Sequence, residues 1–158
     1  MGAVNYGHPT VVLLLLSQGA DPDFTYPDTN ETMLHFAALR GMLEGSTECV
    51  RLLLNAGADP NVHCKAGIVT PALDFGTKVI GETPLHRAAA FGSEAMIQLF
   101  VEAGADVRAT DAHGETPLNL YGRFQRRRPH LRLENGAGKY LEVRANEDQG
   151  FQSTRHRR

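Results

Sequence analysis

The stretch GETPLHRAAAFGSEAMIQLFVEAGADVRATDAHGETPL, residues 81–118, decides the fold class of this chain. Its Thr83 can cap a helix N-terminus, and a proline in the next position is preset for the first helical turn. The small residues Ala88 and Ala89 allow a second helix to approach closely, and Gly92 can end the first helix with a left-handed turn. An apolar stripe follows and stops at Gly-Ala-Asp, 104–106. The stretch therefore predicts two antiparallel helices followed by a loop.

The same pattern recurs along the chain. Gly-Ala-Asp stands at 19–21, 57–59 and 104–106, each time after an apolar run, and variants of Thr-x-Leu-His stand at 32–35, 83–86 and 116–119. From Thr83 to Thr116 is 33 residues. A single helix pair cannot bury its apolar face alone, so units with this period are expected to stack on one another.

These motifs resemble the ankyrin repeat family, in residues 81–118 and in the second-helix endings LLSQGADPD (15–23) and LLNAGADPN (53–61). The resemblance implies an all-α ankyrin repeat solenoid of stacked helix-turn-helix units with inter-repeat loops. The expected division of residues 1–121 is a partial repeat 1–26, a repeat 27–61, an inserted loop 62–77, a repeat 78–110 and a partial repeat 111–121. Residues 122–158 are expected to form a basic, irregular tail. Met1 falls inside the first helix of its unit, a pattern expected of a fragment or of a misplaced start.

Composition limits the protein class. The 158 residues are 42% hydrophobic and 22% charged, which is typical of one globular domain. The apolar run at 11–16 is too short to cross a membrane, and no signal peptide is visible. Two cysteines do not make a disulfide framework, so the sequence favours a reducing, cytoplasmic setting.

Charge divides the chain into two parts. Residues 1–121 hold 6 Lys and Arg against 14 Asp and Glu, whereas residues 122–158 hold 10 against 4. Arginines at 126–128 and near the C-terminus suggest an alternative function, binding of nucleic acid or another acidic surface. The acidic body disfavours a continuous basic footprint, so nucleic acid is not the expected partner. A solvated tail and a tail that folds back onto the acidic repeats are the other interpretations.

The histidines and aspartates of the motifs are expected to be structural. In the family that the chain resembles, the histidine of Thr-x-Leu-His, here His35 and His86, bonds a neighbouring loop and fixes one repeat to the next. Asp21, Asp59 and Asp106 recur at one position, where their side chains can cap loop amides. No nucleophile elbow, phosphate-binding glycine loop or metalloprotease helix is present. We therefore expect no enzymatic activity, no cofactor and no metal.

The two cysteines receive different interpretations. Cys49 lies on the apolar stripe of a second helix, where a thiol behaves as a small hydrophobe. Cys64 is expected in a loop, exposed and open to oxidation. It stands beside His63, and neither has a partner at metal-ligand spacing.

The longest departure from the repeat lies between residues 57 and 83. From Gly57 to Thr83 is 26 residues, against 12 from Gly104 to Thr116, so about fourteen residues are extra. A rival register begins a helix at Thr70-Pro71. It lacks the histidine and the alanine pair and is disfavoured, although a helical turn at 71–75 stays open. About four further residues are extra near 41–44.

The resemblance implies that the chain is a non-catalytic protein-protein interaction module. An unidentified protein would bind the loop tips and the concave first-helix face, and the oligomeric state is left open. The expected partner-binding residues are Asp28, Thr29, Glu31, Leu39, Arg40, Val79, Ile80, Glu82, Ala90, Phe91, Ala112, His113 and Glu115. Phe91 is either a binding anchor or packed against the next unit. The insertion either sets partner choice or is an inert loop.

Overall fold

The protein is a stack of helix pairs, seen here in a computed structural model. The structure describes residues 2–41, 43–70, 79–127, 141–142 and 146. Within them the helices are α1 (Gly2–Asn5), α2 (Pro9–Ser17), α3 (Met33–Leu39), α4 (Ser46–Asn55), α5 (Pro84–Phe91), α6 (Glu94–Glu102) and α7 (Pro117–Arg127). The described residues contain no strand beyond isolated bridges. The expected all-α solenoid is confirmed.

Local chemistry sets the ends of these helices. Thr32 and Thr83 lie in extended backbone at the N-caps of α3 and α5, and each forms a capping box with the histidine three residues later. The Ser93 hydroxyl caps α6 by accepting from the Met96 amide at 3.2 Å. The glycine of each Gly-Ala-Asp follows a second helix in the left-handed conformation, with φ between 85° and 93°.

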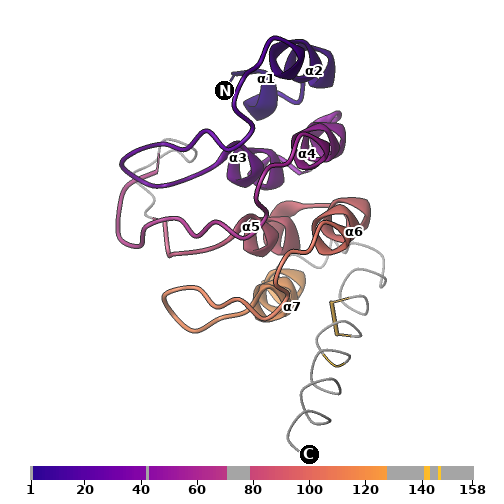
Figure 1. Cartoon of the computed structure of the whole chain (residues 1–158). Helices are drawn as coiled ribbons and strands as arrows, with labels where there is room; N and C mark the ends of the chain where they lie inside the picture. Colours follow the sequence, from indigo (N-terminus) through magenta and orange to yellow (C-terminus); the bar gives the residue numbers. More distant parts are fainter. Residues whose placement is uncertain (1, 42, 71–78, 128–140, 143–145, 147–158) are drawn as a thin grey trace, which may run out of the picture.

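The helices form two rows, with α1, α3, α5 and α7 in one and α2, α4 and α6 in the other (Figure 1). The loops before the first helices project together to one side of the stack. Between the rows lies one hydrophobic core, in which Leu34 and Leu85 of the first row meet Val50, Ile97 and Phe100 of the second. Each of these side chains is fully buried and contributes about 1.5–3 kcal/mol.

Glycines let neighbouring units approach at the turns between paired helices. A Cβ on Gly41 would lie 2.5 Å from the Gly92 Cα, and a Cβ on Gly45 would lie 2.2 Å from the Gly7 carbonyl oxygen. Real Cβ atoms do not come so close to backbone, so these turns require glycine. The extra residues near 41–44 extend one such turn and leave Leu43 exposed.

The segment expected to be an irregular tail begins as a helix. Helix α7 continues to Arg127, so residues 122–127 are helical, because no proline interrupts the chain before Pro129. Further on, Leu141 is 1% exposed and belongs to the hydrophobic core. The arginine-rich C-terminus and the helical turn considered at 71–75 lie outside the described residues.

No helix in the described part of the chain combines the length and the apolar character needed to cross a membrane.

Substituting Gly41 with alanine tests the contact between turns. The new methyl group would press on the Gly92 backbone, so we expect the free energy of unfolding in urea to fall by about 1–3 kcal/mol. Gly2→Ala is the control, since a Cβ there meets nothing within 4 Å. Equal stability of Gly41→Ala and the wild type would contradict the close approach.

Candidate partner-binding site

Three loops project from the stack, and we call them finger 1 (residues 20–32), finger 2 (58–83) and finger 3 (105–116). Fingers 2 and 3 close in the same way, since the Cys64 amide donates to the Glu82 carbonyl and the Asp111 amide donates to the Glu115 carbonyl, each at 3.0 Å. Neighbouring fingers are also bonded to each other. The Lys65 amide donates to the Thr29 carbonyl at 2.7 Å.

The same hydrogen bonds locate the inserted residues in finger 2. Ala112 of finger 3 donates to the Ile80 carbonyl at 2.8 Å, as Lys65 of finger 2 donates to finger 1. Lys65 and Ala112 therefore occupy equivalent positions, so the extra residues follow Lys65 and end at Val79. We call their described part, residues 66–70 and 79, the inserted tip. Beyond Lys65 the two sides of the tip pair through Gly67 N to Val79 O, 2.8 Å, and Val79 N to Ile68 O, 2.9 Å. This start is four residues later than the expected one at 62.

The motif histidines connect one finger to the next, as expected. The Thr32 amide donates to His35 Nδ1 at 3.1 Å, so the ring hydrogen sits on Nε2, which donates to the Glu82 carbonyl at 3.1 Å. His86 repeats the arrangement toward the Glu115 carbonyl, at 3.0 Å. Burial, followed by repulsion from Arg87, lowers the pKa of His35 to about 3, and burial lowers the pKa of His86 as well. Both rings are therefore neutral supports.

The aspartates of Gly-Ala-Asp cap their loops, also as expected. Each carboxylate accepts from the amide two residues later, at 2.9 Å for Asp21 and 2.8 Å for Asp59 and Asp106. A second set of bonds joins the units, since the Asp59 amide donates to the Asp23 carboxylate and the Asp106 amide donates to the Asn61 amide oxygen, each at 2.7 Å.

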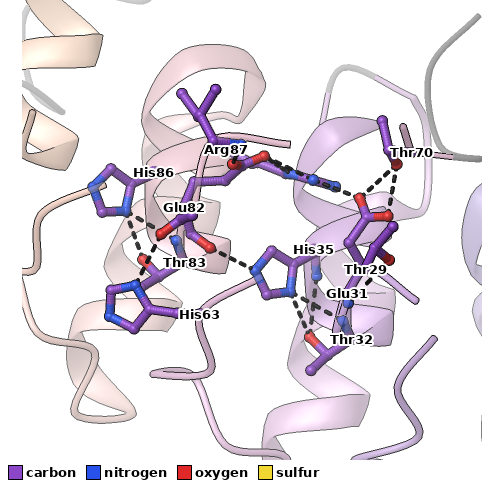
Figure 2. A network of polar contacts seen from close by, with 12 residues as sticks. Thr29, Glu31, Thr32, His35, His63, Thr70, Glu82, Thr83, His86 and Arg87 are labelled. Carbon is purple, nitrogen blue, oxygen red and sulfur yellow. Dashed lines mark hydrogen bonds and ion pairs between the residues drawn. The ribbon is translucent and has the colours of Figure 1, made fainter. Parts of the chain in front are cut away.

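A buried charged cluster lies beneath fingers 1 and 2 (Figure 2). Arg87, on α5, is 4% exposed and lies between two glutamates. Its Nη2 donates to Glu31 Oε1 at 2.5 Å and to Glu82 Oε1 at 2.8 Å, and its Nε donates to Glu82 Oε1 at 3.0 Å. Glu31 and Glu82 each stand immediately before a capping threonine, so one guanidinium connects the bases of two fingers.

The inserted tip is attached to this cluster. Thr70, 2% exposed, directs its hydroxyl to both carboxylate oxygens of Glu31, at 2.7 and 2.6 Å. Cys64 is 4% exposed, so the expectation that its thiol is exposed and oxidisable is wrong. Cys64 occupies the loop position of Asp111, whose side chain is also buried. Burial, followed by the nearby Glu82 carboxylate, raises the pKa of the Cys64 thiol to about 12.

The protonation states follow from this environment. Burial alone would raise the pKa of Glu82, but Arg87 and the amide of Ile80, which donates to Glu82 Oε2 at 2.7 Å, lower it to about 2. Burial alone would likewise lower the pKa of Arg87, but Glu82 and then Glu31 raise it. Glu82 and Arg87 are therefore charged at neutral pH, and their low-dielectric surroundings strengthen the attraction between them.

The predicted binding residues divide into two groups. The structure buries Thr29, Glu31, Leu39, Val79 and Glu82. Glu31 and Glu82 turn inward because Arg87 attracts both, and Leu39 packs into the core, so these side chains are not available to a partner in this conformation. The remaining predicted residues are exposed or partly exposed, and they are Asp28, Arg40, Ile80, Ala90, Phe91, Ala112, His113 and Glu115. Phe91 packs partly against the core.

Two features were missed in the sequence. Arg87 occupies the position after the motif histidine, where the preceding repeat has the core residue Phe36, so a charge there could have signalled a buried partner. The second feature is the apolar pair Ile68 and Val69, 39% and 52% exposed on the inserted tip. A shallow groove of about 430 Å³ separates Val69 and Thr70 from residues 26–29 of finger 1.

The geometry favours recognition over chemistry. In the described ranges no group of three His, Cys, Asp or Glu side chains is arranged to hold a metal ion. His35 and His86 bond the next finger, and Glu31 and Glu82 share Arg87, so these buried groups connect the fingers.

Comparison with known proteins places this geometry in a family. The family model for ankyrin repeats, in three copies, matches residues 1–111.

Similar proteins share the repeat region. The chain is 38% identical over 125 residues to protein PhlB of Serratia liquefaciens, covering 79% of this chain and 47% of that protein. It is 33% identical over 118 residues to ankyrin repeat and SOCS box protein 11 of Danio rerio, covering 75% and 33%. It is 36% identical over 104 residues to SH3 and multiple ankyrin repeat domains protein 2 of Homo sapiens, covering 66% and 5%. The chain thus spans less than half the length of each relative.

Acid should destabilise the fold partly through His35. Its pKa falls from 6.5 to about 3 on folding, so between these values the unfolded chain binds a proton that the folded chain does not. Stability is therefore lost as the pH falls through this window, with a slope of about 1.4 kcal/mol per pH unit for one proton. We expect unfolding free energies measured from pH 6 to 4 to fall less steeply in His35→Gln than in the wild type. Parallel curves would contradict the assignment.

Removing the shared cation tests the charged cluster. Arg87→Met leaves two buried carboxylates without their partner, and we expect a loss of about 3–5 kcal/mol in urea unfolding. The control is the triple variant Arg87→Met, Glu31→Gln, Glu82→Gln, which removes all three charges and should lose less than the single variant. If the single variant loses less than about 1 kcal/mol, the guanidinium does not hold the cluster together.

Proposed function

This chain belongs to the ankyrin repeat family, and we propose that it binds a partner protein through fingers 1 to 3 and the adjacent first-helix surface. Repeats of this family generally mediate protein-protein interaction and form a non-catalytic module. The proposed contact residues are the exposed members of the predicted set, together with the inserted tip of finger 2. Two free, buried thiols agree with the proposed cytoplasmic setting.

The observation that supports this proposal most strongly is the attachment of the inserted tip. Thr70 donates to Glu31, and Arg87 donates to both Glu31 and Glu82. Buried, charge-assisted bonds therefore connect the tip of finger 2 to the base of finger 1 and, through Arg87, to the base of its own finger. Bringing three charged groups out of water is costly, and an inert loop does not need such an anchor. A loop ordered in advance loses less conformational entropy when it binds.

The anchored tip presents apolar surface beside charge. Ile68 and Val69 are exposed, and the groove next to Val69 is bordered by Asp28. Apolar side chains next to a charged rim are the usual composition of a protein-binding patch. We therefore propose that this patch contributes to partner choice, while Phe91 and Arg40 extend the contact along the first-helix surface.

Binding of nucleic acid or another acidic surface through the arginine-rich tail stays a prediction. Arg126 and Arg127 end α7, and the C-terminal arginines lie outside the described part of the chain.

Capture from the cells of origin, with the whole chain as bait, tests the proposal. We expect Ile68→Ser with Val69→Ser to lose partners that the wild type retains, because the double variant removes the apolar patch without touching the core. Leu43→Ser is the matched control, since Leu43 is also an exposed apolar residue but lies in the turn between α3 and α4. Circular dichroism should show equal helix content in all three proteins. If the double variant captures the same partners as the wild type, the proposed role of the tip in binding is contradicted.

A further inference from the structure

The inserted tip carries a backbone edge that is not used by the fold. The two bonds that Val79 makes, from the Gly67 amide and to the Ile68 carbonyl, place two residues opposite one. Gly67 has a left-handed φ of 83°, so the pair forms a β-bulge that fixes the register of the tip. Successive residues of an extended strand direct their backbone groups to opposite edges, so the amide and carbonyl of Val69 face away from Val79. Neither group has a hydrogen bond in the described structure.

This edge faces finger 1. Earlier on the same arm, Lys65 donates to finger 1 twice, from its amide to the Thr29 carbonyl and from its ammonium group to the Pro27 carbonyl, each at 2.7 Å. Beyond Lys65, the described residues of the two fingers share no further backbone bond. The groove of about 430 Å³ lies here, between Val69 and residues 26–29. The regular bonds between fingers therefore end where the groove begins.

The chain is fixed on both sides of Val69. The bulge holds it on one side, and on the other the Thr70 hydroxyl donates to the Glu31 carboxylate, close to Thr29 (Figure 2). Thr70 is buried, whereas Val69 is 52% exposed. The free edge is thus held in an extended form before a partner binds, which reduces the conformational entropy that binding would cost.

The chemistry of the groove selects an extended peptide. The amide and carbonyl of one residue at a strand edge are matched by the carbonyl and amide of one residue in an added strand. Val69 and Tyr26 give the lining apolar surface, and Asp28 at the rim is exposed, with a carboxylate that has no partner among the described residues. These groups suit an apolar side chain next to a cationic one. The carboxylate would repel a chain of phosphates.

We propose that an extended segment of the partner protein, with an arginine or lysine next to an apolar residue, adds as a strand to the Val69 edge of the inserted tip. Its backbone pairs with the amide and the carbonyl of Val69, and its cation pairs with Asp28. This inference rests on the proposed function and specifies how the tip is recognised, through its backbone as well as through its side chains.

Short random peptides displayed on phage and selected on the intact chain test this mode of binding. We expect a class of peptides with a cation next to an apolar residue. Val69→Pro removes the edge amide without breaking any hydrogen bond of the described structure, so it should raise the dissociation constant of these peptides about tenfold. Val69→Ile is the matched control, because it keeps the amide and a β-branched apolar side chain. Fluorescence anisotropy of the synthesised peptides measures both.

Two further measurements do not depend on the proline variant. Methylating the backbone nitrogens of a selected peptide one at a time should weaken binding at the residue that pairs with Val69 and not at its two neighbours, whose amides face the opposite edge. Asp28→Asn should weaken the binding of the cationic peptides, and high salt should reduce the difference between this variant and the wild type. Circular dichroism shows whether each variant is folded.

The inference is overturned if no selected peptide distinguishes Val69→Pro from Val69→Ile, or if methylation has the same effect at every position. Partner capture separates its failure from that of the proposed function. If Val69→Pro retains partners that Ile68→Ser with Val69→Ser loses, the tip binds through its side chains and strand addition is wrong. If both variants retain every partner, the proposed role of the tip is contradicted as well.

Discussion

The ion pairs between one guanidinium and two carboxylates constrain the middle of this solenoid. Arg87 is almost fully buried, and among the described residues it forms ion pairs with Glu31 at the base of one finger and Glu82 at the base of the next. A buried ion without a partner would cost several kcal/mol, so the two fingers must keep the spacing that this side chain sets. Thr70 extends the same constraint to the inserted tip.

Around this cluster, the repeats are joined by hydrogen bonds that involve no ion pair. His35 and His86 each join a capping threonine to a carbonyl of the next finger, and their lowered pKa values keep them neutral. Loop aspartates and backbone amides add a further ladder between units. These supports recur in successive units, whereas the part of the chain that the structure describes holds a single cluster like that of Arg87. The regular bonds make the stack, and the charged cluster distinguishes finger 2 from its neighbours.

Features that depend on chain neighbours or on the repeat could be predicted from the sequence, whereas features that depend on contacts outside the repeat pattern could not. Helix starts at Thr32 and Thr83 and the histidine supports were predictable, because each depends on neighbours along the chain or on the repeat itself. Gly92 ends α5 as expected, but in extended backbone and not in the left-handed turn that the sequence suggested. Glu31 and Glu82 were wrongly expected at the surface, since their position in the repeat says nothing of a cation 56 or 5 residues away. Cys64 was misplaced for a similar reason, because finger closure buries it against Glu82.

The sequence by itself determined the repeat, the helix starts at Thr32 and Thr83, the loop caps and the presence of about fourteen extra residues, because these are matters of spacing and local backbone chemistry. Only the tertiary structure decided which polar side chains turn inward. Stacking brings the bases of two fingers onto α5, and there the attraction of Arg87 outweighs the hydration that would otherwise keep two glutamates at the surface. It also decided that the side chains of Val11 and Leu15 are exposed, because the exposure of a helix face depends on which elements pack against it.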